Sequence, residues 1–472
     1  MLTVVALHGR KPNTVSNGET DINKPKHNNN ELMRKHLLLS LFTLLALTAN
    51  AQKYVGGDIS LLTKYETNGA KYYDKDGVAI TNMLAFLKEQ GLNAMRVRLF
   101  VDPANASNLE KGEGVCQDLA YVKELGKRIK EAGFSLMLDF HYSDVWADPA
   151  KQWTPKAWLG LSDTELYTKI YEYTKECLKA LKDEGVVPDF IQTGNEISYG
   201  MLWGEGIFET YNETKREYKY KSSSNTYYAG SKNQTRFTNL LKKAGEACRE
   251  MCPKAKIILH TERIPNTNYL DDFYKDMKNA GVYYDIIGLS YYPYYHGNFT
   301  TLESSLKQLE TNYPDKYIMI VETGYYYAWQ PDVKSPGADL SKTYPISPAG
   351  QQAFTKALIE TLNKHPKVTG LFWWMMEACE NGLDWNTKRV TDGWYNASLF
   401  NDTDTSVGTG AGYAMPALYE LKSFLPSSDG ISNVITGKVA DNNWYSLDGH
   451  LLKNKPASKG IYINNKKKVI IK

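Results

Sequence analysis

The chain has 472 residues, of which 56 are Lys or Arg and 53 are Asp or Glu, so its formal net charge at pH 7 is only +3. This near balance of charge excludes the strongly basic surface that nucleic-acid and membrane-surface partners require. Hydrophobic residues make up 42% of the sequence, an ordinary share that excludes disorder throughout, and the length is enough to bury a large core.

Residues 33–51 have the three parts of a secretory signal peptide. A basic start with Arg34 and Lys35 precedes an apolar centre over residues 37–47 and an Ala-Asn-Ala cleavage sequence at 49–51. The apolar centre is too short to cross a bilayer. We therefore expect cleavage after Ala51 and an exported protein (periplasmic, at the cell surface or extracellular) that is not an integral membrane protein. Residues 1–32 are polar and rich in Asn, and we expect them to be a non-native or unstructured leader before a start at Met33.

The cysteines do not form a disulfide framework. There are five, an odd and sparse set for an exported chain of this size: Cys116, Cys177, Cys248, Cys252 and Cys379. The sequence leaves a single bridge open without choosing it.

Strand-like and helix-like segments alternate along residues 54–424. Short apolar runs predict strands, and apolar residues spaced by three or four predict helices. The strands are expected over residues 54–60, 94–100, 135–140, 190–194, 256–260, 285–290, 317–321 and 368–374, and the helices over residues 83–90, 119–131, 164–184, 238–251, 271–280, 302–312, 350–364 and 416–424. Eight strands, each followed by a helix, predict an α/β fold of the (β/α)8 or TIM-barrel type. An open doubly wound sheet is the alternative, but no Gly-rich phosphate loop follows the first strand.

The segments that follow the strands are long, whereas those that precede them are short. Residues 142–161 carry Trp146, Trp153 and Trp158. Residues 204–236 are polar and rich in Tyr, and we expect them to be irregular. In such barrels the loops after the strands build the active face. Aromatic rings there suit hydroxylated ligands such as sugars, although for any one ring a place in the core is the commoner explanation.

The alternation of strand-like and helix-like segments ends at residue 426. Ser-Ser-Asp-Gly at 427–430 is typical of a linker. Strand-like pieces follow at 444–447 and 460–463, and Asn464-Asn465 suits a hairpin turn before residues 466–471. We therefore expect a catalytic barrel over residues 52–426 and a linker with a small C-terminal β appendage over residues 427–472.

Two of the expected strands end in a carboxylate. The apolar run 317–321 leads directly to Glu322, and the strand 190–194 leads to Asn195 and Glu196. A charge at the end of a buried strand is costly unless a partner or a function keeps it there. Parallel strands of a barrel end at the same face, so the two glutamates are expected to meet. Glycoside hydrolysis needs such a pair, one to protonate the leaving oxygen and one to attack the anomeric carbon or activate water. A helix cap is the alternative for Asn195 and Glu196.

Four more residues are expected at the same face. Arg96 and Arg98 share one side of the second strand. Arg98 is nearer the strand end, so we expect it to pair with a nucleophilic carboxylate and keep it ionised, although purely structural ion pairs are the alternative. His141 ends the third strand and could instead be a core histidine, and Trp374 ends the eighth and could floor a sugar pocket. Their joint position at strand ends favours a functional role.

The same segments resemble family 53 of the glycoside hydrolases, the endo-β-1,4-galactanases. The resemblance rests on Gly57-Asp58-Ile59-Ser60, Arg96-Val97-Arg98-Leu99, His141-Tyr142-Ser143-Asp144, Trp146-Ala147-Asp148-Pro149, Gly194-Asn195-Glu196, Ser290-Tyr291-Tyr292-Pro293 and Val321-Glu322-Thr323. It covers roughly residues 54–426, and residues 141–149 are its most specific part. It implies a (β/α)8 barrel of the large retaining clan of glycosidases.

The resemblance also implies residue roles and a substrate. Glu196 would be the acid/base and Glu322 the nucleophile. Substrate contacts would come from Arg98, His141, Asn195, Tyr292 and Trp374, with Trp146 and Asp148 shaping the cleft. The substrate would be β-1,4-linked galactan, the side chain of type I arabinogalactan, cleaved with retention into galacto-oligosaccharides. We expect a monomer that needs no cofactor for catalysis.

The sequence departs from the family pattern in two places. Bacterial members often hold a structural calcium in the loop after the seventh strand, but here residues 328–342 offer only Asp332 and Asp339 as carboxylate donors. That is few for a cation that takes about six to eight oxygen ligands. After Trp374 the chain has Met-Met-Glu at 375–377, where the family commonly has Glu-Pro.

Two other hypotheses remain on the sequence alone. A related glycosidase of the same clan could act on another plant polysaccharide, such as a mannan, a xylan or a glucan. A barrel without catalytic activity could bind carbohydrate, although both carboxylates that the chemistry requires are present.

Overall fold

The computed structural model describes residues 51–203, 208–212, 217–220, 231–328, 333–379, 394–402, 411–426, 444–446, 451–452, 454–464 and 467–471. The expected leader, the signal peptide up to residue 50 and the linker at 427–430 lie outside the described residues.

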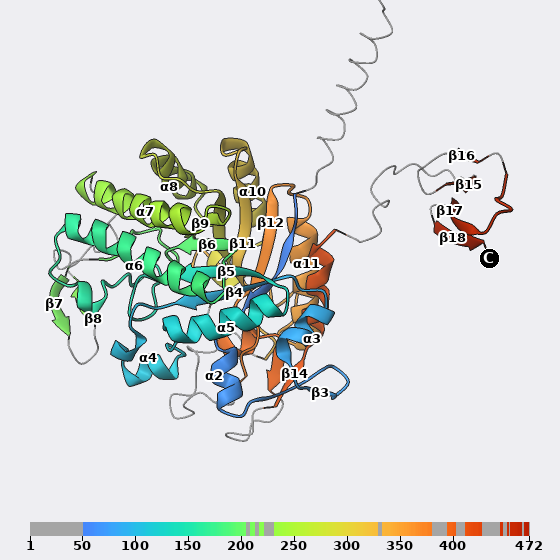
Figure 1. Ribbon diagram of the computed structural model, residues 1–472, viewed down its shortest axis with the longest axis horizontal. Coiled ribbons are helices and arrows are strands. Elements are labelled where there is room, and N and C mark those ends of the chain that lie inside the picture. Colours follow the sequence, from blue (N-terminus) through green and yellow to red (C-terminus); the bar gives the residue numbers. More distant parts are fainter. Residues whose placement is uncertain are drawn as a thin grey trace, which may run out of the picture. The chain divides into compact units, whose positions relative to one another are not determined.

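Eight parallel strands close into a barrel, as the sequence predicts (Figure 1). In order around the barrel they are β1 (Tyr54–Asp58), β4 (Ala94–Leu99), β5 (Ser135–Phe140), β6 (Phe190–Thr193), β9 (Lys256–Thr261), β10 (Ile286–Tyr291), β11 (Tyr317–Thr323) and β12 (Val368–Trp373), which pairs with β1 again. Every expected strand is present with small shifts at its ends. The prediction of a (β/α)8 barrel is therefore confirmed.

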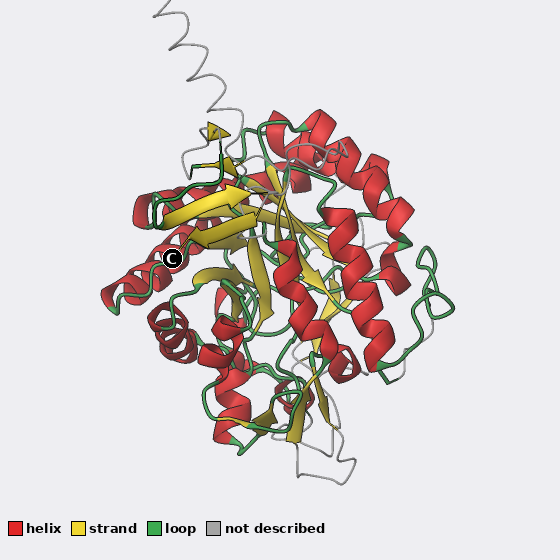
Figure 2. Ribbon diagram, turned by 90° about the vertical axis from the view of Figure 1, so that its right-hand side faces the viewer, coloured by secondary structure: helices red, strands yellow, loops and turns green. Residues whose placement is uncertain are grey.

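Helices cover the outside of the barrel (Figure 2). They are α2 (Leu62–Thr67), α3 (Met83–Glu89), α4 (Asn108–Gly112), α5 (Leu119–Glu131), α6 (Asp163–Asp183), α7 (Ser231–Met251), α8 (Thr267–Asn279), α9 (Pro293–His296), α10 (Phe299–Asn312), α11 (Pro348–Leu362) and α12 (Pro416–Glu420), with 3-10 turns η1 (Pro103–Asn105), η2 (Lys156–Trp158), η5 (Trp394–Ala397) and η6 (Leu421–Phe424). The eight expected helices are among them. The sequence did not predict the short helices α2, α4 and α9.

Helix α6 illustrates how the local sequence sets an element. The Ser162 side chain accepts a hydrogen bond from the backbone N–H of Glu165, and the Glu165 carboxylate accepts one from the backbone N–H of Ser162. This reciprocal capping box satisfies two N–H groups that a helix start otherwise leaves unpaired. Leu166 and Ile170, four residues apart, are both buried on one face of the helix.

The barrel interior has two layers of different chemistry. The layer toward the N-terminal ends of the strands is apolar and contains Ala94, Met137, Phe190, Ile258, Ile286, Met319, Val321 and Phe372. Side chains alternate along a strand, so Arg96 and Arg98 share the inward face of β4 with Ala94, and both are fully buried. Asp139 of β5 and Gln192 of β6 follow interior residues in the same way and are also fully buried. The barrel therefore carries a buried polar layer toward the C-terminal ends of its strands.

A bulge turns Glu322 of β11 toward this polar layer. Met319 and Val321 belong to the apolar interior, so strict alternation would point Glu322 away from the barrel axis. The pairing of β10 with β11 shifts register between Leu289 and Ser290, and Ser290 comes to lie opposite Glu322. Bulges commonly re-aim side chains beside active sites. This local break in the strand pairing therefore points the Glu322 carboxylate into the barrel, whereas regular pairing would point it outward.

Besides the barrel, the described residues form three smaller sheets. One has the order β13-β14-β2-β3 and contains β2 (Lys71–Tyr73), β3 (Ala79–Ile80), β13 (Phe400–Asp402) and β14 (Ala411–Ala414); another pairs β7 (Phe208–Asn212) with β8 (Glu217–Tyr220); the third has the order β16-β15-β17-β18 and contains β15 (Trp444–Tyr445), β16 (Leu451–Leu452), β17 (Gly460–Asn464) and β18 (Lys467–Ile471). The third sheet is the small β appendage expected at the C-terminus, with β17 and β18 paired antiparallel as the predicted hairpin requires.

The expectation that residues 204–236 are irregular is wrong in two places. Strands β7 and β8 form an antiparallel ribbon, and α7 begins at Ser231, well before the expected start at residue 238. A short polar ribbon gives no apolar periodicity by which a sequence could announce it. Only its Thr and Tyr content, which favours strands, points that way.

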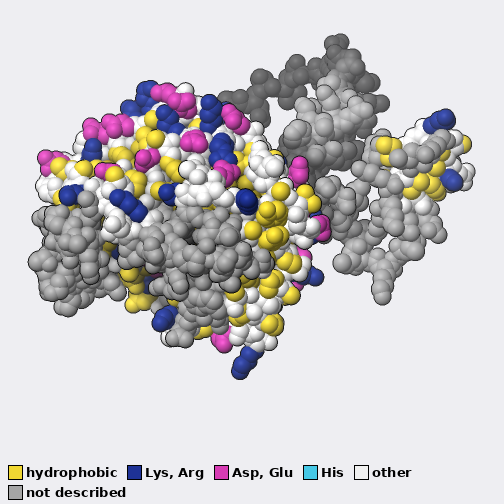
Figure 3. All heavy atoms as spheres, turned by 90° about the horizontal axis from the view of Figure 1, so that it is seen from below, with side chains coloured by type: hydrophobic (Ala, Val, Ile, Leu, Met, Phe, Trp, Pro, Cys, Tyr) yellow, Lys and Arg dark blue, Asp and Glu magenta, His cyan; other side chains and the backbone are white. Residues whose placement is uncertain are grey.

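Three further features concern the surface charge, the apolar character of the helices and the cysteines. On the face shown in Figure 3, Lys and Arg side chains are interspersed with Asp and Glu rather than gathered by sign. Within the described ranges no helix is long and apolar enough to cross a membrane. All five cysteines are free thiols, so the single bridge that the sequence left open is not formed.

Candidate active site

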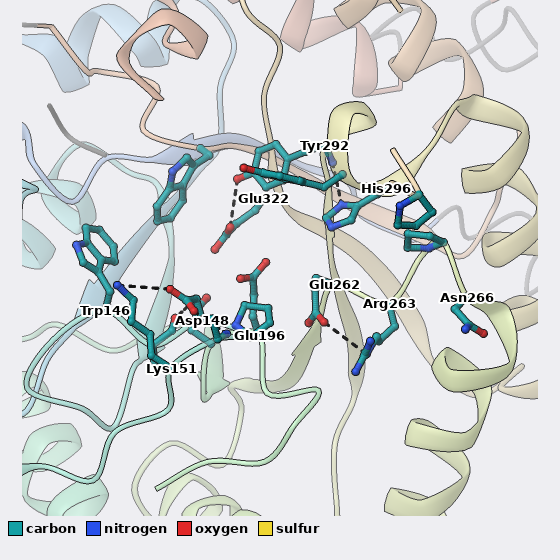
Figure 4. Close-up of a pocket in the computed structure, with 18 of the residues that line it drawn as sticks. Trp146, Asp148, Lys151, Glu196, Glu262, Arg263, Asn266, Tyr292, His296 and Glu322 are labelled. Atoms are coloured by element: carbon teal, nitrogen blue, oxygen red, sulfur yellow. Dashed lines mark hydrogen bonds and ion pairs between the residues drawn. The ribbon is translucent and has the colours of Figure 1, made fainter. Parts of the chain in front are cut away.

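A cavity of about 710 Å³ opens at the C-terminal ends of the barrel strands. Both predicted catalytic glutamates line it, Glu196 after β6 and Glu322 in β11 (Figure 4). Five of the seven residues predicted to bind substrate also line it: Trp146, Asp148, Asn195, Tyr292 and Trp374. The strand-end rule therefore gathers most of the predicted site in one place.

The two glutamates face each other across Ser290. The Ser290 hydroxyl donates to Glu196 Oε1 at 2.7 Å and lies 3.5 Å from Glu322 Oε2. A carboxylate oxygen of each glutamate and a ring nitrogen of His260 all lie within 4.8 Å of one another. Glu196 has a backbone φ of 47°, in the left-handed region that non-glycine residues seldom occupy. Such strain at a strand end is typical of functional sites.

A chain of hydrogen bonds holds Glu196 in place. Burial, and then the charge of Arg96, keep the pKa of His260 well below its usual range, so the ring is neutral. Its Nδ1 accepts from the backbone N–H of Glu196 at 3.3 Å and lies 3.0 Å from both Gln192 Nε2 and Asn195 Oδ1. Its Nε2 lies 2.8 Å from Ser290 Oγ, and the Ser290 hydroxyl donates to Glu196. Glu196 is thus oriented by an acceptor, His260 Nδ1, at its backbone N–H and by a donor, the Ser290 hydroxyl, at its carboxylate.

Glu322 is held by Arg96 and Tyr292. Arg96 Nη2 lies 3.0 Å from Glu322 Oε1, and the Tyr292 hydroxyl donates to Oε2 at 3.2 Å. The same guanidinium also pairs with Asp58 at 3.1 Å and with Asp139 at 2.8 Å. One fully buried cation is therefore shared by three carboxylates, which fixes its position and that of Glu322.

The expectation that Arg98 pairs with the nucleophilic carboxylate is wrong. Arg98 pairs with Asp58 at 2.8 Å, and its guanidinium lies 4.5 Å from the ring centre of Trp146 and 5.2 Å from that of Trp374. Arg96 lies two residues before Arg98 on β4 and so deeper in the barrel, and its side chain extends to Glu322. Proximity of the Cα to the strand end was the wrong criterion, because an arginine side chain is long enough to reach Glu322 from a position two residues deeper in the barrel.

Arg98 and His141 do not line the cavity, so their role in substrate contact stays a prediction. Both are buried, at 0% and 1% exposure. His141 Nδ1 accepts from the backbone N–H of Ala147 at 3.1 Å, and its Nε2 faces Asp139 at 3.1 Å. Burial lowers the pKa of His141 despite the opposing pull of Asp139. The two residues support the cavity wall from behind, His141 through the loop that carries Trp146.

The sequence profile of glycosyl hydrolase family 53 matches residues 54–409. The chain belongs to this family. A protein of Neosartorya fischeri described as a probable arabinogalactan endo-beta-1,4-galactanase A is 31% identical over 381 residues, which cover 76% of this chain and 97% of that protein. The endo-beta-1,4-galactanase of Bacillus subtilis is 30% identical over 324 residues, which cover 68% of each. The solved catalytic domain of a family 53 enzyme from Ignisphaera aggregans is 32% identical and superposes with a TM-score of 0.64 over 79% of this chain and 97% of that chain.

Membership of family 53 makes the protein a glycoside hydrolase, and the environments of its two cavity glutamates differ in the way that this chemistry uses. Burial raises the pKa of Glu322 to about 7, although the charge of Arg96 lowers it. Burial, and then the charges of Glu322 and Glu262, raise the pKa of Glu196 well above its usual range, although the hydrogen bond from Ser290 lowers it. Glu322 is therefore the first of the pair to ionise, while Glu196 keeps its proton.

Trp146 and Trp374 form an aromatic corner of the cavity. Their ring centres lie 6.0 Å apart with an interplanar angle of 62°, and both pack on Arg98. Asn195 donates through Nδ2 to the carbonyl of Ala147 at 2.8 Å and accepts from Arg96 at 2.8 Å. The buried arginines thus set the position of both the aromatic corner and the amide beside Glu196.

Sequence reasoning missed several residues of this family 53 site. Glu262, Arg263, Tyr295, His296 and Met375 line the cavity. Glu262 directly follows β9, so the strand-end rule that found Glu196 could also have found it. Met375 begins the stretch that departs from the family pattern, and its φ of 45° marks another strained turn after a barrel strand. Tyr295 and His296 lie in α9, a short helix that gives no periodic signal.

The described part of the loop after β11 offers one carboxylate, Asp339. Asp339 is exposed, and its Oδ1 accepts from the backbone N–H of Ser341 at 2.9 Å. Across the described residues, the one group of three or more His, Cys, Asp and Glu side chains with converging ligand atoms is Glu196, His260 and Glu322. Asp332, the other carboxylate of this loop, lies outside the described residues, so the expectation about structural calcium stays a prediction.

Proposed function

We propose that this family 53 enzyme is a retaining endo-β-1,4-galactanase that cleaves the galactan of type I arabinogalactan into galacto-oligosaccharides. The observation that carries the proposal is the pairing of Glu196 and Glu322, with carboxylate oxygens within 4.8 Å of each other. Retaining pairs have carboxyl groups about 5 to 5.5 Å apart, whereas inverting pairs leave about 6.5 to 9.5 Å for a water. The names of the fungal and Bacillus relatives support the choice of polymer.

In the first step, ionised Glu322 attacks the anomeric carbon of the galactosyl unit from the face opposite the leaving group. Protonated Glu196 transfers its proton to the departing glycosidic oxygen, so that the leaving chain ends in a neutral hydroxyl. The C1–O bond to the leaving sugar breaks as the C1–O bond to Glu322 forms. The product is a covalent α-galactosyl ester of Glu322 and a shortened galactan.

In the second step, Glu196, now ionised, takes a proton from water as that water attacks the anomeric carbon. The ester bond to Glu322 breaks and both glutamates return to their starting states. Two inversions restore the β configuration. The proton that Glu196 lost in the first step comes back from the water, so the cycle balances.

The surrounding residues serve these steps. Arg96 at 3.0 Å and Tyr292 at 3.2 Å favour the ionised form of Glu322 before attack. Ser290 at 2.7 Å orients the Glu196 carboxyl. Trp374 and Trp146 offer apolar faces on which a sugar ring can stack, and Asn195 and Asp148 offer polar atoms for its hydroxyls.

The test is release of reducing sugar from linear β-1,4-galactan by wild type, Glu322→Gln and a control, Glu303→Gln. Glu303 pairs with Lys364 on the outer helices, away from the barrel face. We expect short galacto-oligosaccharides from wild type and from the control, and a rate lower by several orders of magnitude for Glu322→Gln, as for other deleted nucleophiles. Wild-type activity on mannan, xylan or glucan but not on galactan would contradict the assignment of galactan as the substrate. Binding of galactan without any bond cleavage would contradict the assignment of a hydrolytic activity.

We also propose that the protein is exported and acts as a monomer. The signal-peptide pattern over residues 33–51 supports export. N-terminal sequencing of the protein from the native cell should begin at Gln52. Light scattering of the purified chain should give the mass of one copy. A mature N-terminus at Met1 or Met33, or the mass of two copies, would contradict the respective proposal.

A further inference from the structure

Besides Glu196, Glu322 and Asp148, the cavity is lined by a fourth carboxylate, Glu262, to which the two-step mechanism gives no role. Glu262 follows β9, lines the cavity with Arg263, and has 12% of its side chain exposed. Its Oε2 accepts from the Ser198 hydroxyl at 2.6 Å, and its Oε1 lies 3.4 Å from Arg263 Nε. The carboxylate is therefore held at a fixed place while it still faces the cavity, with lone pairs that neither neighbour occupies.

Aromatic rings continue the cavity beyond Glu262. The Arg263 guanidinium lies 4.0 Å from the ring centre of Tyr199 and 5.7 Å from that of Tyr269. Tyr269, in the first turn of α8, is 62% exposed, and Tyr295 is 37% exposed. Both tyrosines line the cavity. Exposed aromatic rings that line a cavity suit the apolar faces of sugar units.

The position of Glu262 and Arg263 relative to the two catalytic glutamates indicates on which side of the scissile bond they lie. Figure 4 shows Glu262 and Arg263 on the side of Glu196 away from Glu322 and Trp146. A general acid must lie against the oxygen of the leaving group, and the nucleophile must lie against the carbon that stays bound. Residues beyond Glu196 therefore face the sugar that leaves.

We propose that Glu262 and Arg263 bind the sugar unit on the leaving-group side of the scissile bond. Glu262 accepts hydrogen bonds from its ring hydroxyls, Arg263 donates to them, and Tyr269 and Tyr295 contact the units that follow. The inference rests on the proposed function in its choice of a β-1,4-linked galactose as that sugar. In the second step the same subsite can hold an acceptor sugar, whose hydroxyl then replaces water and is deprotonated by Glu196.

This assignment separates two kinds of substrate. A polymer places a sugar beside Glu262, and a lost polar partner there leaves other buried polar groups unpaired. A 2,4-dinitrophenyl β-galactobioside places no sugar there, and its leaving group departs without a proton. A subsite residue should matter for the first substrate and not for the second.

The experiment compares kcat/KM on both substrates for wild type, Glu262→Gln, Glu262→Ala and the control Glu303→Gln. For the two Glu262 variants we expect a loss of about 10- to 100-fold on galactan and a change of less than about twofold on the dinitrophenyl glycoside. The share of glycosyl transfer to added galactobiose should fall in the same variants. Arg263→Met should follow the same pattern. Thermal unfolding of each variant shows whether it is folded.

The outcomes distinguish this inference from the proposed function. Equal losses of kcat/KM on both substrates, or no loss on galactan, would overturn the assignment of Glu262 and Arg263 to this subsite. A basic limb of the galactan pH profile that moves down in Glu262→Gln while the plateau rate is kept would mean that Glu262 acts only through the charge of Glu196, and would overturn it too. Wild type that cleaves only another polymer would contradict the proposed function, and the same ratio measured on that polymer would then decide the subsite.

Discussion

Replacing Tyr292 by Phe should move the acid limb of the pH–rate profile upward. The Tyr292 hydroxyl donates to Glu322 Oε2 at 3.2 Å, and a hydrogen bond to a carboxylate favours its ionised form. The pKa of Glu322, raised by burial, is already about 7 with this bond in place. Without the bond the ionised nucleophile loses one of its two supports, so its pKa rises further.

The size of the shift follows from the geometry. A hydrogen bond to a charged group contributes about 1.5 to 3 kcal/mol. The distance of 3.2 Å is long for an O–H···O bond, whose usual length is about 2.7 to 2.8 Å, so the lower end of this range applies. At about 1.4 kcal/mol per pKa unit, the limb should move from about pH 7 to about pH 8. At about pH 6, Tyr292→Phe should then keep a fraction of its plateau activity that is about tenfold smaller than the fraction that wild type keeps.

The assay is kcat/KM for galactan as a function of pH, because this ratio reports the ionisations of the free enzyme. Tyr292 also lines the cavity, so a loss of sugar contact would lower the whole profile without moving it. The matched control is Tyr313→Phe, which removes a buried-ring hydroxyl bonded to the Asp271 carbonyl at 2.9 Å on the outer helices. An acid limb that stays in place, or moves down, in Tyr292→Phe would refute the assignment of Glu322 as the group that must ionise.

Two further predictions test the buried carboxylates. Arg96→Lys keeps one positive charge but cannot span Asp58, Asp139 and Glu322 as a planar guanidinium does; it should lower the melting temperature and move the acid limb of kcat/KM upward, and an unchanged limb would contradict the role of Arg96. Burial raises the pKa of Glu377 to about 8, so its contribution to stability is fully present below its unfolded pKa and is lost as pH rises through about 8. The stability of wild type minus that of Glu377→Gln, followed by denaturant unfolding, should therefore fall by about 5 kcal/mol from about pH 4 to about pH 9; a difference independent of pH would contradict it.

The sequence predicted the barrel because its signal repeats. Each strand is a short apolar run, buried on both faces, and each is followed by an amphipathic segment of helical length. The same regularity located Glu196 and Glu322, since a charge that closes an apolar run is conspicuous. It also failed to report Glu262, although this residue follows β9 in the same manner, because the fifth strand was ended one residue early at His260.

Relations across the barrel could not be predicted from one strand at a time. The choice of Arg96 over Arg98 as the partner of Glu322 depends on how far a side chain reaches along the barrel axis. The inward orientation of Glu322 depends on a bulge against β10, and bulges carry no apolar signature of their own. The family resemblance implies substrate contact for His141, but one strand at a time does not show that the loop with Ala147 folds over this residue.

The most direct test of the central claim is to find which residue becomes covalently bonded to the sugar. An activated 2-deoxy-2-fluoro galactobioside should slow the second step more than the first, so that the glycosyl-enzyme accumulates, and mass spectrometry of its peptides locates the bond. We predict one added galactobiosyl unit on the peptide with Glu322, and none in Glu322→Gln. A label on Glu196, or turnover with an α product and no covalent species, would contradict the retaining mechanism proposed here.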